Sequence, residues 1–478
     1  MKTKEINRIL LADGYKYSHP PQYPIRTVNQ YDYVEARSLK LYNKTLVHGY
    51  QGMMKEYFTT PISKREIDEA ELITKLQGID FDRTGWDIIL NEYDGYLPIT
   101  IKAVKEGTLL PNQNVMCTIE LTEDDARIFW VVSWLETFLM KVWYPCSVGT
   151  RAFFVKMMLM EMAKITSDTP FVDYQYVNFG DRGSSSVESA EIGGTAHLTC
   201  FSVSDNTNCL KYIMNNYNVP LSEGMNITST IDASEHSTVT SWGKDGEPDF
   251  VMNFLEINKN KRFIACVGDS YDIYNFTNFV TTGEFKEKIE SEEYPTFIIR
   301  PDSGNAVEVI ERMLDIMERN GVNYTFNSKG YKVFNKMRLL WGDGINMETM
   351  RDILSILILR KYSTENMVFG SGGWLMQEIS RDSLGFAAKC SEITFDDGST
   401  REIYKEPITA PNKKSKKGRV TTYINNEGDF VTCIIDDIPE DGVNALHIIF
   451  QNGKMIDEED FFTIRKRVNE FLELELNS

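Results

Sequence analysis

The chain has 478 residues, a length that predicts two or more domains or one large barrel with additions. Its 42% hydrophobic and 25% charged residues are typical of a globular protein with a sizeable core, and they exclude an intrinsically disordered chain. The formal net charge of −19 argues against non-specific nucleic-acid binding, which requires a broad basic surface. It does not exclude an anionic small molecule in a locally cationic pocket.

Cysteine usage and hydropathy indicate the compartment. The 7 cysteines are scattered and form no C-x-x-C pair, which favours reduced thiols over a disulfide framework or a zinc knuckle. The N-terminal MKTKEINRILLADGY has no apolar run long enough for a signal peptide. The most apolar window, residues 128–144, carries Glu136 and Lys141 and therefore predicts a buried helix rather than a membrane span. We expect a cytoplasmic protein.

Three regions follow one another along the chain. Residues 97–121 alternate apolar with polar side chains and contain turn signals, which predicts antiparallel strands. Four short apolar runs then each end in a loop rich in Gly or Asp: FIACV (263–267), FII (297–299), MRLLW (337–341) and MVF (367–369). Helices are predicted over 306–319, over 348–361, and after the last loop through Ile379. Residues 430–455 alternate again.

Successive strand, loop and helix units are typical of a parallel βα architecture. The predicted fold class is therefore α/β, an irregular (β/α) barrel with a β-rich second domain built from the N- and C-terminal segments. The expected boundaries are 1–150 for the N-terminal part of the β-rich domain, 151–385 for the barrel and 386–478 for the C-terminal part that completes the β-rich domain.

The loops at the ends of these strands carry the candidate chemistry, because the active site of a βα barrel lies at that end. RPDSGN (300–305), GDG (342–344) and GSGG (370–373) let main-chain N–H groups approach an anion, and Arg300, Arg381, Lys389 and the cationic stretch 412–419 add positive charge. We expect a phosphate-rich substrate, although each motif alone is also compatible with an ordinary turn. Asp302 and Asp343 suit ribose hydroxyls, and they equally suit Mg²⁺ on a diphosphate.

One of the 5 histidines, His236, lies in ASEHSTVTSWG (233–243), between a glutamate and a run of hydroxyl side chains. A neutral imidazole serves as proton carrier, metal ligand or nucleophile, and it also occurs as a hydrogen-bonded core residue. The stretch alone leaves these alternatives open.

Long stretches of the chain resemble the nicotinamide phosphoribosyltransferase family. The matching stretches, in chain order, are LLADGYKYSHPPQYP (10–24), YDGYLPITIKAVKEG (93–107), NFGDRGSSS (178–186), ASEHSTVTSWGKD (233–245), GDSYDIYN (268–275), IIRPDSGN (298–305), GDG (342–344), FGSGG (369–373) and APNKKSKKGR (410–419). The resemblance implies a type II phosphoribosyltransferase of NAD salvage. Such an enzyme is a homodimer that joins nicotinamide to 5-phosphoribosyl 1-pyrophosphate with Mg²⁺, giving nicotinamide mononucleotide and pyrophosphate.

The resemblance also implies site residues. Phe179 and, from the other subunit, Tyr15 in the segment from Asp13 would sandwich the pyridine ring, while Arg182 and Asp205 hold its amide. The ribose and phosphates would meet Arg300, Asp302, Gly342, Asp343, Gly372, Gly373 and Arg381, with Arg37, Lys389 and Lys413 from the partner subunit. His236 would be phosphorylated by ATP as an activating co-substrate, oriented by Asp269.

Asp205 bears on the choice of base. An ionised carboxylate accepts from an amide NH₂ and repels the carboxylate of nicotinate, at a cost of roughly 100-fold or more in discrimination. The alternatives are a nicotinate phosphoribosyltransferase, a non-catalytic binding protein with this fold, and a metal-dependent hydrolase, which would need clustered histidines. Gly14, Asp181, Ala265 and Trp374 depart from the family pattern; a glycine is frequent where Trp374 stands.

Overall fold

The computed structural model describes residues 6–169, 171–409 and 414–477. The chain divides into two compact units. The β-rich unit comprises Met1–Thr150, Ile213–Val219 and Ile379–Phe471, and the barrel unit comprises Arg151–Tyr212, Pro220–Glu378 and Leu472–Ser478. Three helices carry residues of both units: α5 (Trp143–Thr166), α7 (Thr207–Asn216) and α16 (Phe461–Asn477).

Strands from both ends of the chain build the β-rich unit. Its strands are β1 (Thr27–Glu35), β2 (Lys44–Leu46), β3 (Ile99–Val104), β4 (Leu109–Pro111), β5 (Val115–Leu121), β14 (Ala387–Phe395), β15 (Thr400–Glu402), β16 (Val420–Ile424), β17 (Phe430–Ile434), β18 (Val443–Asn444), β19 (Leu446–Gln451) and β20 (Lys454–Met455). Seven of them form one sheet in the order β15-β14-β1-β5-β3-β19-β20. The antiparallel pairs β1 with β14 and β3 with β19 join early to late segments, which confirms the prediction from alternating hydropathy.

Helices α1 (Tyr50–Phe58), α2 (Lys64–Leu76), α3 (Arg83–Glu92), α4 (Val131–Leu139) and α15 (Arg381–Leu384) complete this unit. The apolar window 128–144 forms the buried α4 and, after a 3₁₀ turn (Met140–Val142), the start of α5. A buried helix was predicted there, and the structure confirms it. In the described part of the chain, no helix combines the length and apolar character needed to cross a membrane.

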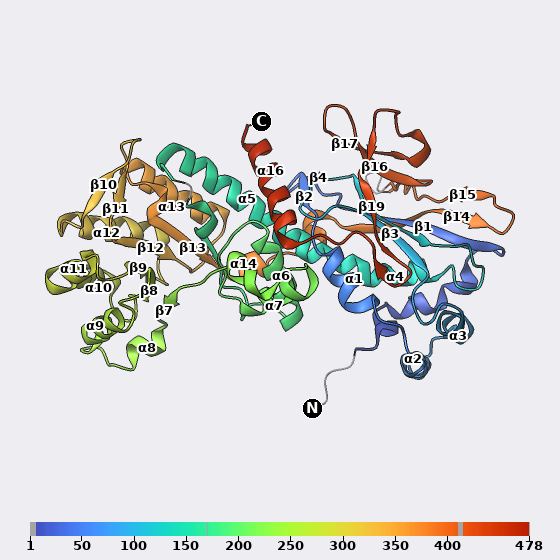
Figure 1. Ribbon diagram of the computed structural model, residues 1–478, viewed down its shortest axis with the longest axis horizontal. Helices are drawn as coiled ribbons and strands as arrows, with labels where there is room; N and C mark the ends of the chain where they lie inside the picture. Colours follow the sequence, from blue (N-terminus) through green and yellow to red (C-terminus); the bar gives the residue numbers. More distant parts are fainter. Residues whose placement is uncertain (1–5, 170, 410–413, 478) are drawn as a thin grey trace. The chain divides into compact units, whose positions relative to one another are not determined.

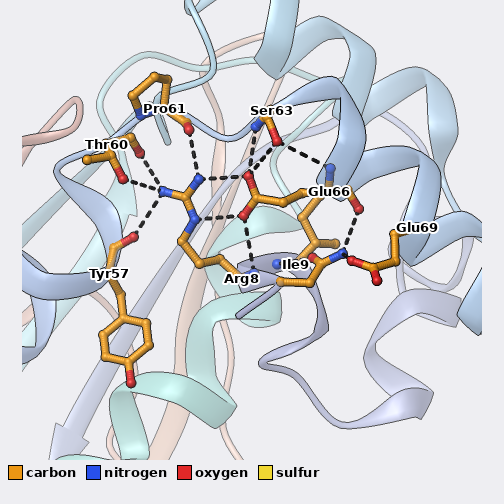
Figure 2. A network of polar contacts seen from close by, with 9 residues as sticks. Arg8, Ile9, Tyr57, Thr60, Pro61, Ser63, Glu66 and Glu69 are labelled. Carbon is orange, nitrogen blue, oxygen red and sulfur yellow. Dashed lines mark hydrogen bonds and ion pairs between the residues drawn. The ribbon is translucent and has the colours of Figure 1, made fainter. Parts of the chain in front are cut away.

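A dense polar network fixes the N-terminal segment onto α2 (Figure 2). Arg8 donates from Nε and Nη2 to the two carboxylate oxygens of Glu66, each at 2.8 Å. The guanidinium also donates to the carbonyl oxygens of Tyr57, Thr60 and Pro61. Burial alone would raise the pKa of Glu66, but hydrogen bonds from Arg8 and from the cap of α2 outweigh it and lower the pKa to about 2. The segment that leads to Tyr15 therefore starts from a rigid anchor.

The barrel unit contains a parallel sheet with helices packed beside it (Figure 1). Its strands are β6 (Tyr176–Asn178), β7 (Asp232–Ala233), β8 (Phe263–Val267), β9 (Thr296–Arg300), β10 (Tyr324–Phe326), β11 (Lys332–Phe334), β12 (Met337–Trp341) and β13 (Met367–Ser371). Its helices are α6 (Val187–Leu198), α8 (His236–Thr240), α9 (Glu247–Ile257), α10 (Ile273–Val280), α11 (Gly283–Glu290), α12 (Ala306–Arg319), α13 (Met347–Leu359) and α14 (Gly373–Met376).

Six strands pair in the order β6-β13-β12-β9-β8-β7, and every pair is parallel. Isolated parallel bridges extend the sheet from Asn178 to Ser204 and from Val203 to Ser229, three residues before β7 begins. The sheet therefore curls back toward its own first strand. This arrangement confirms the predicted barrel-like α/β fold.

Helix caps explain the regular alternation of strands and helices. Asp272, Asn305 and Asn346 each accept a hydrogen bond from a main-chain N–H in the first turn of α10, α12 and α13. The helix predicted over 306–319 coincides with α12, whose buried face includes Ile310 and Leu314. The helix predicted through Ile379 was too long: α14 ends at Met376, because a new cap at Ser380 starts α15.

The inner face of the curled sheet is apolar. One side chain from each of several neighbouring strands meets the others in a buried cluster of Val177, Val203, Ala265, Ile298, Leu340 and Val368. Phe179 and Phe263 pack against the cluster. These side chains line the interior of the curled sheet, and the carboxyl ends of the strands lie at one end of it.

Candidate active site

Polar and aromatic side chains gather at the carboxyl ends of the parallel strands. Phe179 follows β6, His236 follows β7, Asp269 follows β8, and Arg300 is the last residue of β9, directly before Pro301 and Asp302. Gly342 and Asp343 follow β12, and Gly372 and Gly373 follow β13. Parallel pairing brings these positions to one edge of the sheet.

A cavity of about 480 Å³ opens inside the curled sheet. Phe179, Asp205 and Arg300 line it together with the apolar side chains of the inner cluster. Phe179 is half-buried, and its amide N–H donates to the carbonyl oxygen of Ser371 at 2.9 Å. The cavity offers one aromatic face, apolar walls, a carboxylate and a guanidinium, which suit a flat heterocycle with a polar edge.

Asp205 is held at the rim of this cavity. Its main-chain N–H donates to the carbonyl oxygen of Asn178 at 3.1 Å, and its carboxylate accepts a hydrogen bond from the hydroxyl of Thr230. Partial burial raises the pKa of Asp205, and the hydrogen bond from Thr230 and the positive charge of Arg300 oppose the shift. Asp205 and Arg300 thus interact electrostatically within one cavity.

Asp302 lies where several charges meet. Burial raises its pKa most strongly; Arg300 and His236 oppose that rise, whereas the like charges of Asp269 and Asp343 add to it. The Nε atom of Arg300 is buried and has no hydrogen-bond partner in the described part of the chain. A donor left unpaired beside a group of carboxylates is arranged to meet a ligand that carries acceptors.

His236 and Asp269 form a direct contact. Nε2 of the imidazole lies 2.9 Å from Oδ1 of Asp269, and the other carboxylate oxygen of Asp269 accepts from the hydroxyl of Ser303. Buried Ser234 fixes the strand that leads to His236, because its N–H donates to Ala265 and its hydroxyl accepts from the N–H of Val267, each at 2.9 Å. The side chain of His236 is 47% exposed and that of Asp269 only 7%. His236 is therefore no core residue: a buried acid orients its ring, and the ring remains open to a reactant.

The glycines of the loops differ in their surroundings. A Cβ on Gly370 would lie 1.9 Å from Cε2 of Phe179, so this position allows the ring to approach the strand. A Cβ on Gly342 would contact Asp302 and Phe179 at 3.3 and 3.5 Å. A Cβ on Gly373 would meet nothing within 4 Å, so its backbone faces open space. Gly373 is also exposed, so there is room for a ligand beside it.

The remaining sequence-predicted site residues do not line the cavity. Arg182 is exposed in the turn that follows Phe179. Tyr15, Arg37, Arg381 and Lys389 belong to the β-rich unit. Lys413 lies outside the described residues.

Tyr15 is 58% exposed although the residues around it are fixed. Asp13 exchanges hydrogen bonds with Thr137, and Lys16 forms an ion pair of 2.5 Å with Glu136. The neighbours of Tyr15 therefore fix its turn, and its ring stays largely open to solvent.

Two supporting hydroxyls, those of Ser303 and Thr230, were not predicted from the sequence. Ser303 lies within the quoted motif RPDSGN, so its side chain was available as a signal, but its partner Asp269 is 34 positions away. Arg338 also lines the cavity, but it was not predicted as a site residue. It lies within the apolar run 337–341, and a single charged residue in such a run gives no separate signal.

No three His, Cys, Asp or Glu side chains of the described ranges converge as a preformed metal site. Asp269 and Asp343 act on Asp302 as like charges that raise its pKa. Mg²⁺ keeps several waters and is commonly held by one or two carboxylates together with substrate phosphates, so Asp302 and Asp343 would hold it only with a phosphate ligand present.

Two family models match different parts of the chain, and named relatives match nearly all of it. The model of the nicotinate phosphoribosyltransferase (NAPRTase) family matches residues 174–454, and the model of the nicotinamide phosphoribosyltransferase N-terminal domain matches residues 7–101. A protein from Xanthomonas campestris named nicotinamide phosphoribosyltransferase is 38% identical over 459 residues, covering 95% of this chain and 96% of the relative. One with the same name from Acinetobacter baylyi is 26% identical and covers 98% of both chains.

Two solved structures share the fold. Nicotinate-nucleotide pyrophosphorylase from Pyrococcus furiosus has a TM-score of 0.65 at 13% identity, covering 100% of this chain and 99% of the other. Human nicotinic acid phosphoribosyltransferase has a TM-score of 0.55, also at 13% identity, covering 98% and 94%.

Proposed function

Because the chain belongs to the nicotinate phosphoribosyltransferase family, we propose that it transfers a phosphoribosyl group from 5-phosphoribosyl 1-pyrophosphate to nicotinamide. The products are nicotinamide mononucleotide and pyrophosphate, and the reaction belongs to NAD salvage. One observation carries the proposal: Phe179, Asp205 and Arg300 line a single cavity, at whose edge Arg300 and Asp302 interact.

The pyridine ring stacks on Phe179, and Tyr15 of a second subunit covers its other face. Two aromatic faces suit a flat ring and stabilise the pyridinium cation of the product. Arg182 donates to the amide oxygen. The exposure of Tyr15 on its anchored turn supports this role. Under this proposal the enzyme is a homodimer, and each subunit completes the site of its partner.

Asp205 selects nicotinamide over nicotinate. Its carboxylate accepts from the amide NH₂, whereas it repels a second carboxylate at that position. The hydrogen bond from Thr230 and the charge of Arg300 both favour the ionised form of Asp205, which this selection requires.

Transfer itself requires positioning and charge stabilisation more than covalent help. The pyridine nitrogen forms a bond to the anomeric carbon while the bond from that carbon to the pyrophosphate oxygen breaks, and pyrophosphate leaves with the bonding electrons. Asp302 and Asp343 hold the ribose hydroxyls and stabilise the positive charge that develops on the sugar. Mg²⁺, when bound near these carboxylates, neutralises charge on the pyrophosphate.

The phosphates meet main-chain N–H groups of the loops at Gly342, Gly372 and Gly373, with Arg300 and Arg381. Arg37, Lys389 and Lys413 of the partner subunit complete the phosphate end. The pKa of Lys389 is lowered, and burial is the largest cause. A phosphate that binds beside this ammonium group would oppose the shift, because a negative charge favours the protonated form.

His236 accepts the γ-phosphoryl group of ATP and thereby couples ATP hydrolysis to transfer. Because Nε2 of the ring faces Asp269, Nε2 carries the proton and Nδ1 is the nucleophile. A bond forms between Nδ1 and the γ-phosphorus, the bond from that phosphorus to the bridging oxygen breaks, and ADP leaves. Asp269 then balances the positive charge of the phosphorylated ring.

We also propose that the enzyme acts in the cytoplasm; 5 of its 7 cysteines are buried, as suits thiols that stay reduced. The decisive assay incubates the purified protein with 5-phosphoribosyl 1-pyrophosphate, Mg²⁺ and either base, with and without ATP. Mass spectrometry should identify nicotinamide mononucleotide, and ATP should increase its yield. Preferential formation of nicotinate mononucleotide would reject the assigned base.

A further inference from the structure

The barrel unit contains a buried guanidinium without an acidic partner. Arg151, on α5, is 4% exposed. Its Nη2 donates to the main-chain carbonyl oxygen of Glu378 at 3.1 Å. Its Nε and Nη1 are buried and have no hydrogen-bond partner in the described parts of the chain, and Arg151 forms no ion pair there. A buried cation in this state is costly, so an anion nearby would relieve it.

The same guanidinium stacks on the residue that follows the last glycine loop. Its central carbon lies 4.3 Å from the centroid of the Trp374 ring. Trp374 comes directly after Gly372 and Gly373, and Glu378 ends the same short segment. The N–H groups of Gln377 and Glu378 both donate to the carbonyl oxygen of Gly373, at 2.7 and 2.9 Å. Arg151 therefore clamps this turn at its beginning, through Trp374, and at its end, through Glu378.

We propose that Arg151 is a positioning residue for the phosphate-binding loop, acting through Trp374. The stacked ring fixes the backbone of Gly372 and Gly373 in the conformation that presents their N–H groups. The unpaired charge adds positive potential behind the loop, where the low dielectric of the interior transmits it effectively. This role rests on the proposed function, because the proposed function identifies the phosphate ligand as 5-phosphoribosyl 1-pyrophosphate.

The test compares Arg151→Met, Trp374→Leu and the double variant, with Arg151→Lys as the conservative change. Arg151→Met should raise KM for 5-phosphoribosyl 1-pyrophosphate about tenfold, in line with a desolvated cation–π pair, while KM for nicotinamide changes less than about twofold. Because Arg151 acts through Trp374, the double variant should lose no more than the worse single variant. A lysine cannot stack and donate in the same plane, so Arg151→Lys should recover only part of the loss.

Arg312→Met is the matched control, since Arg312 also stacks on an aromatic ring of the same unit, 3.8 Å from the centroid of Tyr274. That variant should leave both KM values unchanged. Equal rises in both KM values for Arg151→Met, or additive losses in the double variant, would overturn the proposal. If Arg151→Met fails to fold, Trp374→Leu alone provides the same split between the two KM values.

Binding of inorganic pyrophosphate, measured by titration calorimetry, separates this inference from the proposed function. Arg151→Met should weaken the binding about tenfold relative to the wild type even if no nicotinamide mononucleotide is formed. Unchanged pyrophosphate affinity would overturn the role of Arg151 while leaving the transferase reaction intact.

Discussion

Nε2 of His236 lies 2.9 Å from Oδ1 of Asp269, and Asp269 in turn accepts a hydrogen bond from Ser303. The acid is nearly buried and the ring is half exposed. In the described part of the chain no hydrogen bond reaches the second ring nitrogen of His236, and the orientation of the ring depends on a residue 33 positions away.

His236→Ala should abolish stimulation by ATP and retain basal transfer. Asp269→Asn should preserve the size of the side chain but no longer favour the His236 tautomer that is protonated at Nε2. It should therefore lower phosphohistidine formation by a factor on the order of 100 or more. Incorporation of label from γ-³²P-ATP measures this directly. Ser237→Ala, which removes a neighbouring hydroxyl that bonds to Glu235, should behave as the wild type. Stimulation by ATP that survives in His236→Ala would defeat the assignment.

Asp205→Asn should relax the selection of the base. The variant loses the repulsion of nicotinate, so the ratio of kcat/KM for nicotinamide to that for nicotinate should fall roughly 100-fold. A competition assay with both bases measures the ratio. Asp181→Asn removes a neighbouring negative charge that does not line the cavity and serves as the control. An unchanged ratio in Asp205→Asn would show that another group selects the base.

The preference for nicotinamide should also depend on pH in a defined direction. Because burial raises the pKa of Asp205, its protonation begins at a higher pH than for an ordinary aspartate. As the pH falls, the acid loses its charge earlier than an ordinary aspartate would, and the ratio of the two kcat/KM values should decline. In Asp205→Asn, the ratio should no longer show the pH dependence that titration of Asp205 causes. If the ratio changes with pH equally in wild type and variant, titration of the bases alone explains the change.

Gly370→Ala should weaken the binding of nicotinamide and leave the binding of the phosphate groups unchanged. The added Cβ would lie 1.9 Å from the ring of Phe179, so the ring must move out of the cavity wall. KM for nicotinamide should rise about tenfold or more. In the Phe179→Ala background the same substitution should have little further effect, because no ring remains to displace. A rise in that background would point to backbone distortion instead.

Mixed dimers test the contribution of Tyr15. Tyr15→Ala and Asp302→Asn should each be nearly inactive, yet mixed subunits should recover roughly a quarter of the wild-type activity, because half of the dimers contain one intact composite site. Activity of the unselected mixture after co-expression measures this recovery, and heterodimers isolated through two affinity tags should reach roughly half of the wild-type activity. No recovery would mean that Tyr15 serves the site of its own subunit.

The Arg8–Glu66 pair predicts an acid-sensitive anchor. The pKa of Glu66 is lowered to about 2, so the stabilisation is present above the ordinary pKa of glutamate and is lost as the pH falls through about 4 toward 2. Glu66→Gln should reduce the free energy of unfolding by up to about 3 kcal/mol at neutral pH, and the difference should shrink below pH 4. Urea titrations at several pH values measure it. Glu69→Gln, at the exposed edge of the network, should change little.

The sequence by itself determined the class of fold and the chemistry of the loops. Apolar runs such as 337–341 and caps such as Asn305 act over a few residues, so local patterns suffice to predict β12 and α12. Motifs such as RPDSGN likewise carry their own donors and acceptors. The short strands β6 and β7 were not predicted, because two or three residues contain no periodicity and pairing with neighbours alone makes them strands.

Only the tertiary structure decided which residues share a site. Asp205 approaches Arg300 because the sheet curls and the bridges at Val203 and Asn178 bring distant segments together. The stacking of Arg151 on Trp374 spans more than two hundred positions, and no local pattern encodes it. Strand pairing and burial act between segments that are remote along the chain, so they select partners that spacing and composition leave undetermined.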